Sequence, residues 1–126
     1  MKAELQEKLF KKYPSLFEYR KPEYNKKYLI PIVFGLEVGD GWYGLLDELF
    51  GKMVELDKKV RLTQVKEKFG GLRAYIDGEV DGMFELIEEY EEKSINTCEI
   101  CGKKGKIDGF GGGWIRTLCE DCRGKE

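Results

Sequence analysis

The stretch "RLTQVKEKFGGLRAYID", residues 61–77, has the pattern of a β-hairpin, and the rest of the fold can be laid out around it. Two strand-like runs flank Gly70-Gly71, a dipeptide suited to a two-residue hairpin turn. A turn at that dipeptide gives one largely apolar face, with the cross-strand pairs Phe69 with Leu72, Glu67 with Ala74 and Val65 with Ile76. The opposite face carries Lys66, Lys68, Arg73 and Tyr75.

This basic face of the hairpin is the first candidate binding surface. In the expected register Lys68 lies opposite Arg73, and like charges placed side by side destabilise a sheet by a few tenths of a kcal/mol. Three explanations stay open. Neighbouring acids such as Glu37 offset the repulsion, an anionic partner does so, or the face is simply solvated.

The segments on either side of the hairpin predict three helices and one more strand. Residues 2–12 form a short helix, and residues 32–38 alternate as a strand with Ile32, Phe34, Leu36 and Val38 on one side. The clearest helix lies within residues 39–56, with Asp40 as its N-cap. Its apolar stripe is Trp42, Leu45, Leu46, Leu49, Met53 and Leu56. A last helix covers roughly residues 80–95, with one acidic side and one apolar side formed by Phe84, Ile87 and Tyr90.

All four cysteines lie in two Cys-x-x-Cys pairs, Cys98 with Cys101 and Cys119 with Cys122, separated by seventeen residues. This spacing is typical of a structural zinc site, in which each pair supplies two thiolates to one tetrahedral ion. A redox dithiol, two disulfides and an iron site remain as alternatives. Four thiolates fill the coordination of zinc, so we expect the ion to stabilise the fold and not to act in catalysis.

Together these elements predict an α+β fold. A small, mainly antiparallel sheet, made of a strand plus the hairpin, packs against two helices and is followed by a C-terminal four-cysteine zinc ribbon. Residues 1–97 form the body, in which residues 1–31 are a helix plus an irregular segment. Residues 98–126 form the zinc-binding segment, which packs on the body.

Composition narrows the classes of function. The chain has 126 residues with 22 basic and 24 acidic side chains, which argues against a general nucleic-acid binder. It has no histidine, so imidazole bases, imidazole metal ligands and every catalytic triad that uses an imidazole are excluded. No apolar run is long enough for a membrane span, and the start lacks the apolar middle of a signal peptide. We therefore expect a reducing cytoplasm, where paired cysteines more often bind metal than form disulfides.

Four blocks of the sequence, "FGLEVGDGWYGLLDEL", "QVKEKFGGLRAYI", "EEYEEKSINTCEICG" and "GGWIRTLCEDC", resemble a group of short, uncharacterised proteins of bacteriophages and prophage-bearing bacteria. The resemblance runs from about residue 32 to residue 122. It implies a small cytoplasmic protein with a four-cysteine zinc site and a viral origin. It implies no established activity.

The functional expectation is a non-enzymatic protein that binds a macromolecule, most simply a host or phage protein, as an inhibitor or counter-defence factor would. Its candidate contacts are Lys66, Lys68, Arg73, Tyr75, Trp114 and Arg116. A nucleic-acid-binding accessory protein is the alternative, because residues 13–28 interleave aromatic and basic side chains that could hold a single strand. A hydrolase or nuclease acting through scattered carboxylates is a second alternative. The oligomeric state is left open.

Overall fold

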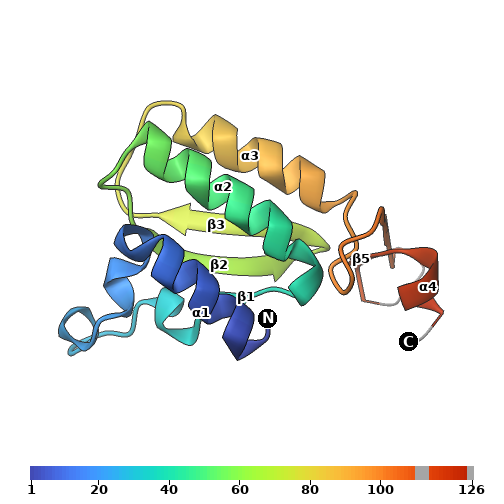
Figure 1. Ribbon diagram of the computed structural model, residues 1–126, viewed down its shortest axis with the longest axis horizontal. Coiled ribbons are helices and arrows are strands. Elements are labelled where there is room, and N and C mark those ends of the chain that lie inside the picture. Colours follow the sequence, from blue (N-terminus) through green and yellow to red (C-terminus); the bar gives the residue numbers. More distant parts are fainter. Residues whose placement is uncertain (110–113, 125–126) are drawn as a thin grey trace.

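The structure is a computed structural model that describes residues 1–109 and 114–124, and it confirms the α+β fold (Figure 1). The helices are α1 (Ala3–Lys12), α2 (Tyr43–Leu56), α3 (Met83–Ser94) and the short α4 (Glu120–Arg123). The strands are β1 (Leu36–Glu37), β2 (Leu62–Lys68), β3 (Gly71–Ile76), β4 (Lys106–Asp108) and β5 (Arg116–Leu118). One sheet has the order β1-β2-β3, and β4 and β5 form a separate antiparallel ribbon.

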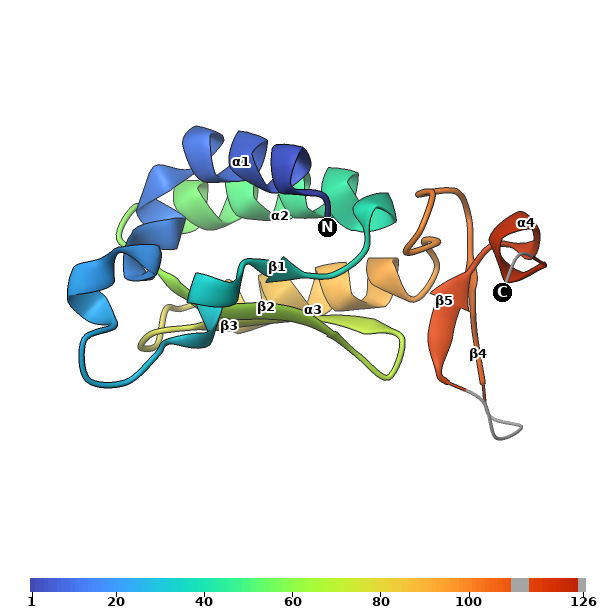
Figure 2. The same cartoon turned by 90° about the horizontal axis from the view of Figure 1, so that it is seen from below.

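The body of the molecule is a layer of helices on one side of the three-stranded sheet. Figure 2 shows α1 and α2 on that side, with β4, β5 and α4 at one end of the molecule. Helix α3 runs beside α2 in Figure 1, and it also contacts β3. The core between the layers includes Leu46, Leu49 and Met53 of α2, with Val65 and Leu72 from the hairpin, all fully buried. The sheet is antiparallel along its longer pairing, β2 with β3, and β1 joins β2 in parallel.

The hairpin forms, but its turn is one residue earlier than expected. Phe69 (φ 53°) and Gly70 (φ 84°) are the central residues, as a turn with two positive φ angles requires. The strands consequently pair Lys66 with Arg73 and Glu67 with Leu72. Arg73 therefore pairs with Lys66, two residues before the Lys68 that was expected. Because side chains alternate between the two faces of a strand, a shift of two residues leaves each side chain on its expected face.

One local hydrogen bond and two from distant parts of the chain hold the earlier turn. The N–H of Gly70 donates to Oε2 of Glu67 at 2.7 Å, and the carbonyl oxygen of Gly70 accepts from Oγ1 of Thr117 at 2.7 Å. The N–H of Leu72 donates to Oγ of Ser94 at 2.9 Å. These bonds hold Phe69 in a backbone conformation that bulky residues rarely adopt.

The segment expected to be a strand, residues 32–38, begins instead as a 3₁₀ helix. Pro31–Phe34 form that turn, Gly35 has a φ of 88°, and only Leu36–Glu37 pair with β2. Pro31 favours the first position of a helical turn, and Gly35 breaks the extended path. Ile32, Leu36 and Val38 are buried as expected, but Phe34 is exposed. Residues 13–31 are likewise not fully irregular, since they include the 3₁₀ helices Pro14–Arg20 and Pro22–Tyr24.

Three further expectations for the helices were wrong. Asp40 does not cap α2, because its Oδ1 accepts the backbone N–H of Lys2 at 2.7 Å while a 3₁₀ turn over Asp40–Trp42 precedes the helix. Leu56, the last residue of the predicted apolar stripe of α2, is exposed to solvent and not buried. Phe84 is 73% exposed, and its neighbour Met83 is buried in its place.

Candidate metal centre and binding groove

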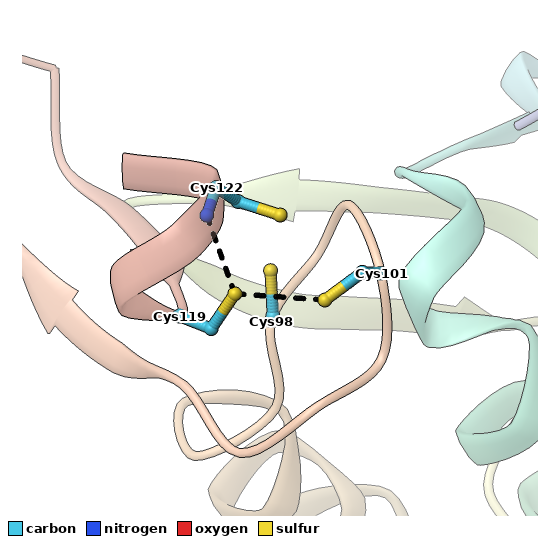
Figure 3. Close-up of side chains that lie close together, drawn as sticks. All are labelled: Cys98, Cys101, Cys119 and Cys122. Carbon is cyan, nitrogen blue, oxygen red and sulfur yellow. Dashed lines mark hydrogen bonds between the residues drawn. The ribbon is translucent and has the colours of Figure 1, made fainter. Parts of the chain in front are cut away.

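The four cysteine sulfurs converge, as the spacing predicts. Their Sγ atoms all lie within 4.8 Å of one another, and the Cys101 and Cys119 sulfurs are 3.6 Å apart (Figure 3). Ligands at the zinc–sulfur distance of about 2.3 Å in a tetrahedron lie ~3.8 Å from each other. All four cysteines are free, and a disulfide would need sulfurs about 2 Å apart. The cluster can therefore hold one metal ion.

Local backbone geometry aims each pair of thiols at the same point. In the first pair, the N–H of Gly102 donates to the carbonyl oxygen of Cys98 at 2.9 Å, and Gly102 has a φ of 84°. In the second pair, Cys119 is the N-cap of α4, and its sulfur accepts the N–H of Cys122 at 3.4 Å. Each knuckle is thus a tight turn that places its two sulfurs on one side.

The thiols perturb each other's acidity. Burial raises the pKa of Cys98, but hydrogen bonds from the backbone of Cys101, Cys119 and Ile100 outweigh burial and lower it to about 6. Hydrogen bonding to the Cys119 side chain raises the pKa of Cys122 to about 12. Four thiolates at this spacing repel one another, so full deprotonation requires a bound cation.

In the cysteine module, residues 97–109 and 114–124, four hydrogen bonds connect to residues 39–42 and Gly70 of the body. The carbonyl oxygen of Glu99 accepts the N–H of Gly41 at 2.7 Å, and Oε2 of Glu99 accepts the N–H of Gly39 at 2.9 Å. Nε1 of Trp42 donates to the carbonyl oxygen of Thr97 at 2.8 Å. The fourth bond is the one from Thr117 to Gly70 in the hairpin turn.

Sequence reasoning missed Glu99 and Thr117 as attachment residues. Glu99 is 8% exposed, and burial raises its pKa above the ordinary value, opposed by the hydrogen bond from Gly39. The "GDG" motif before Trp42 was the available signal, because a Cβ at Gly39 or Gly41 would meet the backbone of the module.

Gly41→Ala should detach the cysteine module from the body. A Cβ there would lie 2.1 Å from the carbonyl oxygen of Cys98 and 2.6 Å from the nitrogen of Gly102, so backbone must move. We expect a loss of ~1–3 kcal/mol in the free energy of unfolding, measured by denaturant titration.

Gly44→Ala is the matched control for Gly41→Ala. Gly44 lies in α2 with nothing within 4 Å of an added Cβ. Alanine there should be neutral or stabilise the protein by up to about 1 kcal/mol. Equal free energies of unfolding for the two variants would contradict the attachment of the module at Gly41.

The basic face of the hairpin is not an isolated positive patch. Arg73 forms an ion pair with Glu91 of α3, so the acidic helix supplies one of the acids that offset the repulsion. Glu37 is the register partner of Lys66 in the parallel β1–β2 pairing, so it lies on the same face. The like-charged neighbours Lys66 and Arg73 thus each have an acid beside them.

A groove with a volume of about 880 Å³ lies between β3 and α3. Its apolar lining includes Phe69, Tyr75, Ile76, Met83, Phe84 and Ile87. Phe69 (64%), Tyr75 (42%) and Phe84 (73%) are exposed. The sequence suggested Tyr75 as a contact but missed Phe69 and Phe84, because both were assigned to the core.

The candidate partner-binding residues fall into two groups. Lys68, Arg73 and Tyr75 line the groove, and Lys66, Trp114 and Arg116 do not. Trp114 does not pack on its own module, since 90% of its surface is exposed. Arg116 begins β5 and is half-buried.

In the described part of the chain, the four cysteines are the cluster of potential metal ligands. Within the same residues, no helix has both the length and the apolar character needed to cross a membrane. Comparison with protein-family models, with curated proteins and with solved structures finds no match to this chain.

Proposed function

We propose that this protein is a non-enzymatic, zinc-stabilised binding protein whose partner is another protein, received in the groove between β3 and α3. The observation that carries the proposal is the group of exposed aromatic side chains at the groove, Phe69, Tyr75 and Phe84. Contiguous exposed apolar surface marks interaction sites, and aromatic side chains supply much of the binding energy in protein interfaces.

Zinc is the ion we propose for the four-cysteine cluster. Four thiolates in a tetrahedral arrangement suit Zn²⁺ and leave no open position for substrate. Iron is the competing ion, since it also accepts four thiolates. The ion's role is to join the two knuckles, and through them to hold the attachments at Gly41 and Gly70.

Metal analysis of freshly purified, reduced protein should find one zinc ion per chain, because the site has one set of four ligands. Elemental analysis by plasma mass spectrometry checks this, and the visible absorbance of iron–thiolate centres distinguishes the competitor. Iron at the same stoichiometry would replace zinc in the proposal. Absence of both would overturn the metal centre.

The charges near the groove favour a protein over a nucleic acid. Glu79, Asp81 and Glu85 line the groove and would repel phosphates, while Arg73 is already paired with Glu91. Among the scattered carboxylates that a hydrolase could use, three already accept hydrogen bonds from other residues of the chain. Asp40 accepts the backbone N–H of Lys2. Asp47 accepts hydrogen bonds from Tyr13 and Lys12. Asp77 accepts the hydroxyl of Tyr19.

A phage-type origin is part of the proposal and rests on the resemblance of the four sequence blocks. On that view the partner is a host or phage protein, and the protein acts in the cytoplasm of the infected cell. Four free thiols beside one another fit a reducing compartment.

Tyr75→Glu/Phe84→Glu should abolish partner capture without unfolding the protein, because both side chains are exposed at the groove. Aromatic contacts at the centre of an interface each contribute about 2 kcal/mol or more, so we expect affinity to fall at least ~100-fold. Titration calorimetry with the captured partner measures the loss.

The matched control is Tyr28→Glu/Phe34→Glu, which changes two aromatic residues of similar exposure outside the groove. This variant should bind as the unmodified protein does. Captures are run from host lysate with and without nuclease. A partner that disappears after nuclease treatment, and whose affinity falls steeply with log salt, would overturn the protein-partner proposal in favour of nucleic acid.

A further inference from the structure

Strand β3 lies at an edge of the sheet, and part of its outer side faces the groove. The order β1-β2-β3 leaves β3 with one strand neighbour (Figure 1). The N–H of Leu72 points away from β2, because it donates to Ser94 of α3, whereas the N–H of Asp77 donates to Arg61 on the β2 side at 3.0 Å. Backbone groups alternate along a strand, so those of Ala74 and Ile76 also point away from β2.

Helix α3 accepts one hydrogen bond from the outer edge of β3. Oγ of Ser94, at the C-terminal end of the helix, accepts the N–H of Leu72. For the N–H groups of Ala74 and Ile76, no acceptor is found in the described part of the chain. Both residues line the groove together with Met83 and Ile87. The groove thus combines unpaired strand backbone with an apolar helix side.

The charge of the groove says what kind of chain would fit. Arg73 and Glu91 neutralise each other, which leaves Lys68 against the three acids Glu79, Asp81 and Glu85. The exposed side of α3 adds the acidic residues Glu88 and Glu92, while Glu89 is paired with Lys93. An occupant with Lys or Arg among its apolar side chains complements this field, and a polyanion does not.

We propose that β3 accepts an extended, basic and apolar segment of the partner protein as an additional strand of the sheet, with α3 packing on the segment's apolar side chains. This inference rests on the proposed function and names the partner's recognition element. Backbone pairing would supply affinity, and the groove lining at Tyr75 and Phe84 would select alternate side chains. The groove volume of about 880 Å³ lies within the range that encloses a few residues of a ligand.

The free protein offers the first test. Amide hydrogen exchange followed by NMR should show Ala74 and Ile76 exchanging at least ~100-fold faster than Arg73 and Tyr75, whose N–H groups face β2. Equal, slow exchange at all four amides in the monomer would mean that the edge is already paired, and the inference would fail.

The second test uses a random linear peptide library, with peptides about 10 residues long, selected against the zinc-loaded protein. Selected sequences should alternate apolar residues with Lys or Arg. Their binding should slow exchange at Ala74 and Ile76 at least ~10-fold. Methylating the peptide's backbone nitrogens that face β3 should abolish binding, because it removes the donors of the added strand.

Charge-reversed and aromatic variants separate the parts of the inference. Glu79→Lys/Glu85→Lys should select acidic peptides in place of basic ones, and Phe84→Glu should select none. Phe34→Glu is the control and should select the same peptides as the unmodified protein, since Phe34 lies outside the groove.

Each remaining outcome is decisive. Peptides that bind while exchange slows elsewhere would overturn strand addition and leave the protein-partner proposal standing. If no peptide is selected but Tyr75→Glu/Phe84→Glu still blocks partner capture, strand addition is wrong and the protein-partner proposal stands. A concentration-dependent dimer that protects the same amides would replace the peptide with a second copy of the chain. A nucleic-acid partner would overturn both proposals.

Discussion

Trp42→Ala should lower the free energy of unfolding by ~3–5 kcal/mol, the range seen when a large buried aromatic site is emptied. Trp42 is fully buried, and its indole N–H donates to Thr97 of the cysteine module. The substitution therefore leaves a cavity beside α2 and removes one attachment of the module. Thermal and denaturant unfolding measure the loss.

The same substitution at the second tryptophan is the control. Trp114 is 90% exposed, so Trp114→Ala should change stability by no more than about 0.5 kcal/mol. The loss of unfolding free energy in Trp42→Phe should lie between those of Trp42→Ala and Trp114→Ala. Phenylalanine keeps most of the packing but leaves the carbonyl oxygen of Thr97 without its donor. A midpoint that barely moves in Trp42→Ala, with partner capture lost, would show instead that Trp42 serves as a recognition residue.

Cys98→Ser should abolish metal binding and unfold the cysteine module while the body stays folded. Cys98 is completely buried, and structural zinc sites supply on the order of 10 kcal/mol to the folding of small metal-binding units. The body has its own core, which draws on α1, α2, α3 and the hairpin and does not include the cysteines. Limited trypsin digestion of the variant should cut the unfolded module, at sites such as Lys103, Lys104 and Lys106, and should spare the folded body.

Lys103→Ser in the same loop is the control, since its side chain is exposed and only its backbone bonds to Cys98. It should keep its metal and resist digestion at the other sites. Partner affinity should fall in Cys98→Ser, because the module anchors the hairpin turn at the end of the groove. Stoichiometric metal in purified Cys98→Ser would contradict the four-cysteine site.

The features that the sequence predicted correctly are those set by local spacing. The Cys-x-x-Cys pairs place their thiols by turn geometry alone, and the alternation in the hairpin assigns faces that survive a shift of the turn. The stripe of α2 predicted Trp42, Leu46, Leu49 and Met53 as core for the same reason.

The features that sequence reasoning missed depend on contacts between distant segments. The turn at Phe69-Gly70 is held by Thr117, which lies 47 residues further along the chain. Phe84 matches the apolar periodicity of its helix, but the rotation of α3 against α2 and β3 buries Met83 and leaves Phe84 at the groove. No periodicity reports that rotation, so the groove could not be predicted.

The attachment of the cysteine module at Gly41 and Gly70 has a consequence for how the protein accumulates in a cell. Both attachment sites lie in the body, and the ribosome completes the body before it makes Glu99 and Thr117. Newly made chains therefore leave these sites uncovered until the module closes around its ion. Chains that find no ion keep a loose tail that proteases recognise. At a constant rate of synthesis, the steady-state level of the protein should then rise and fall with the cell's supply of that ion.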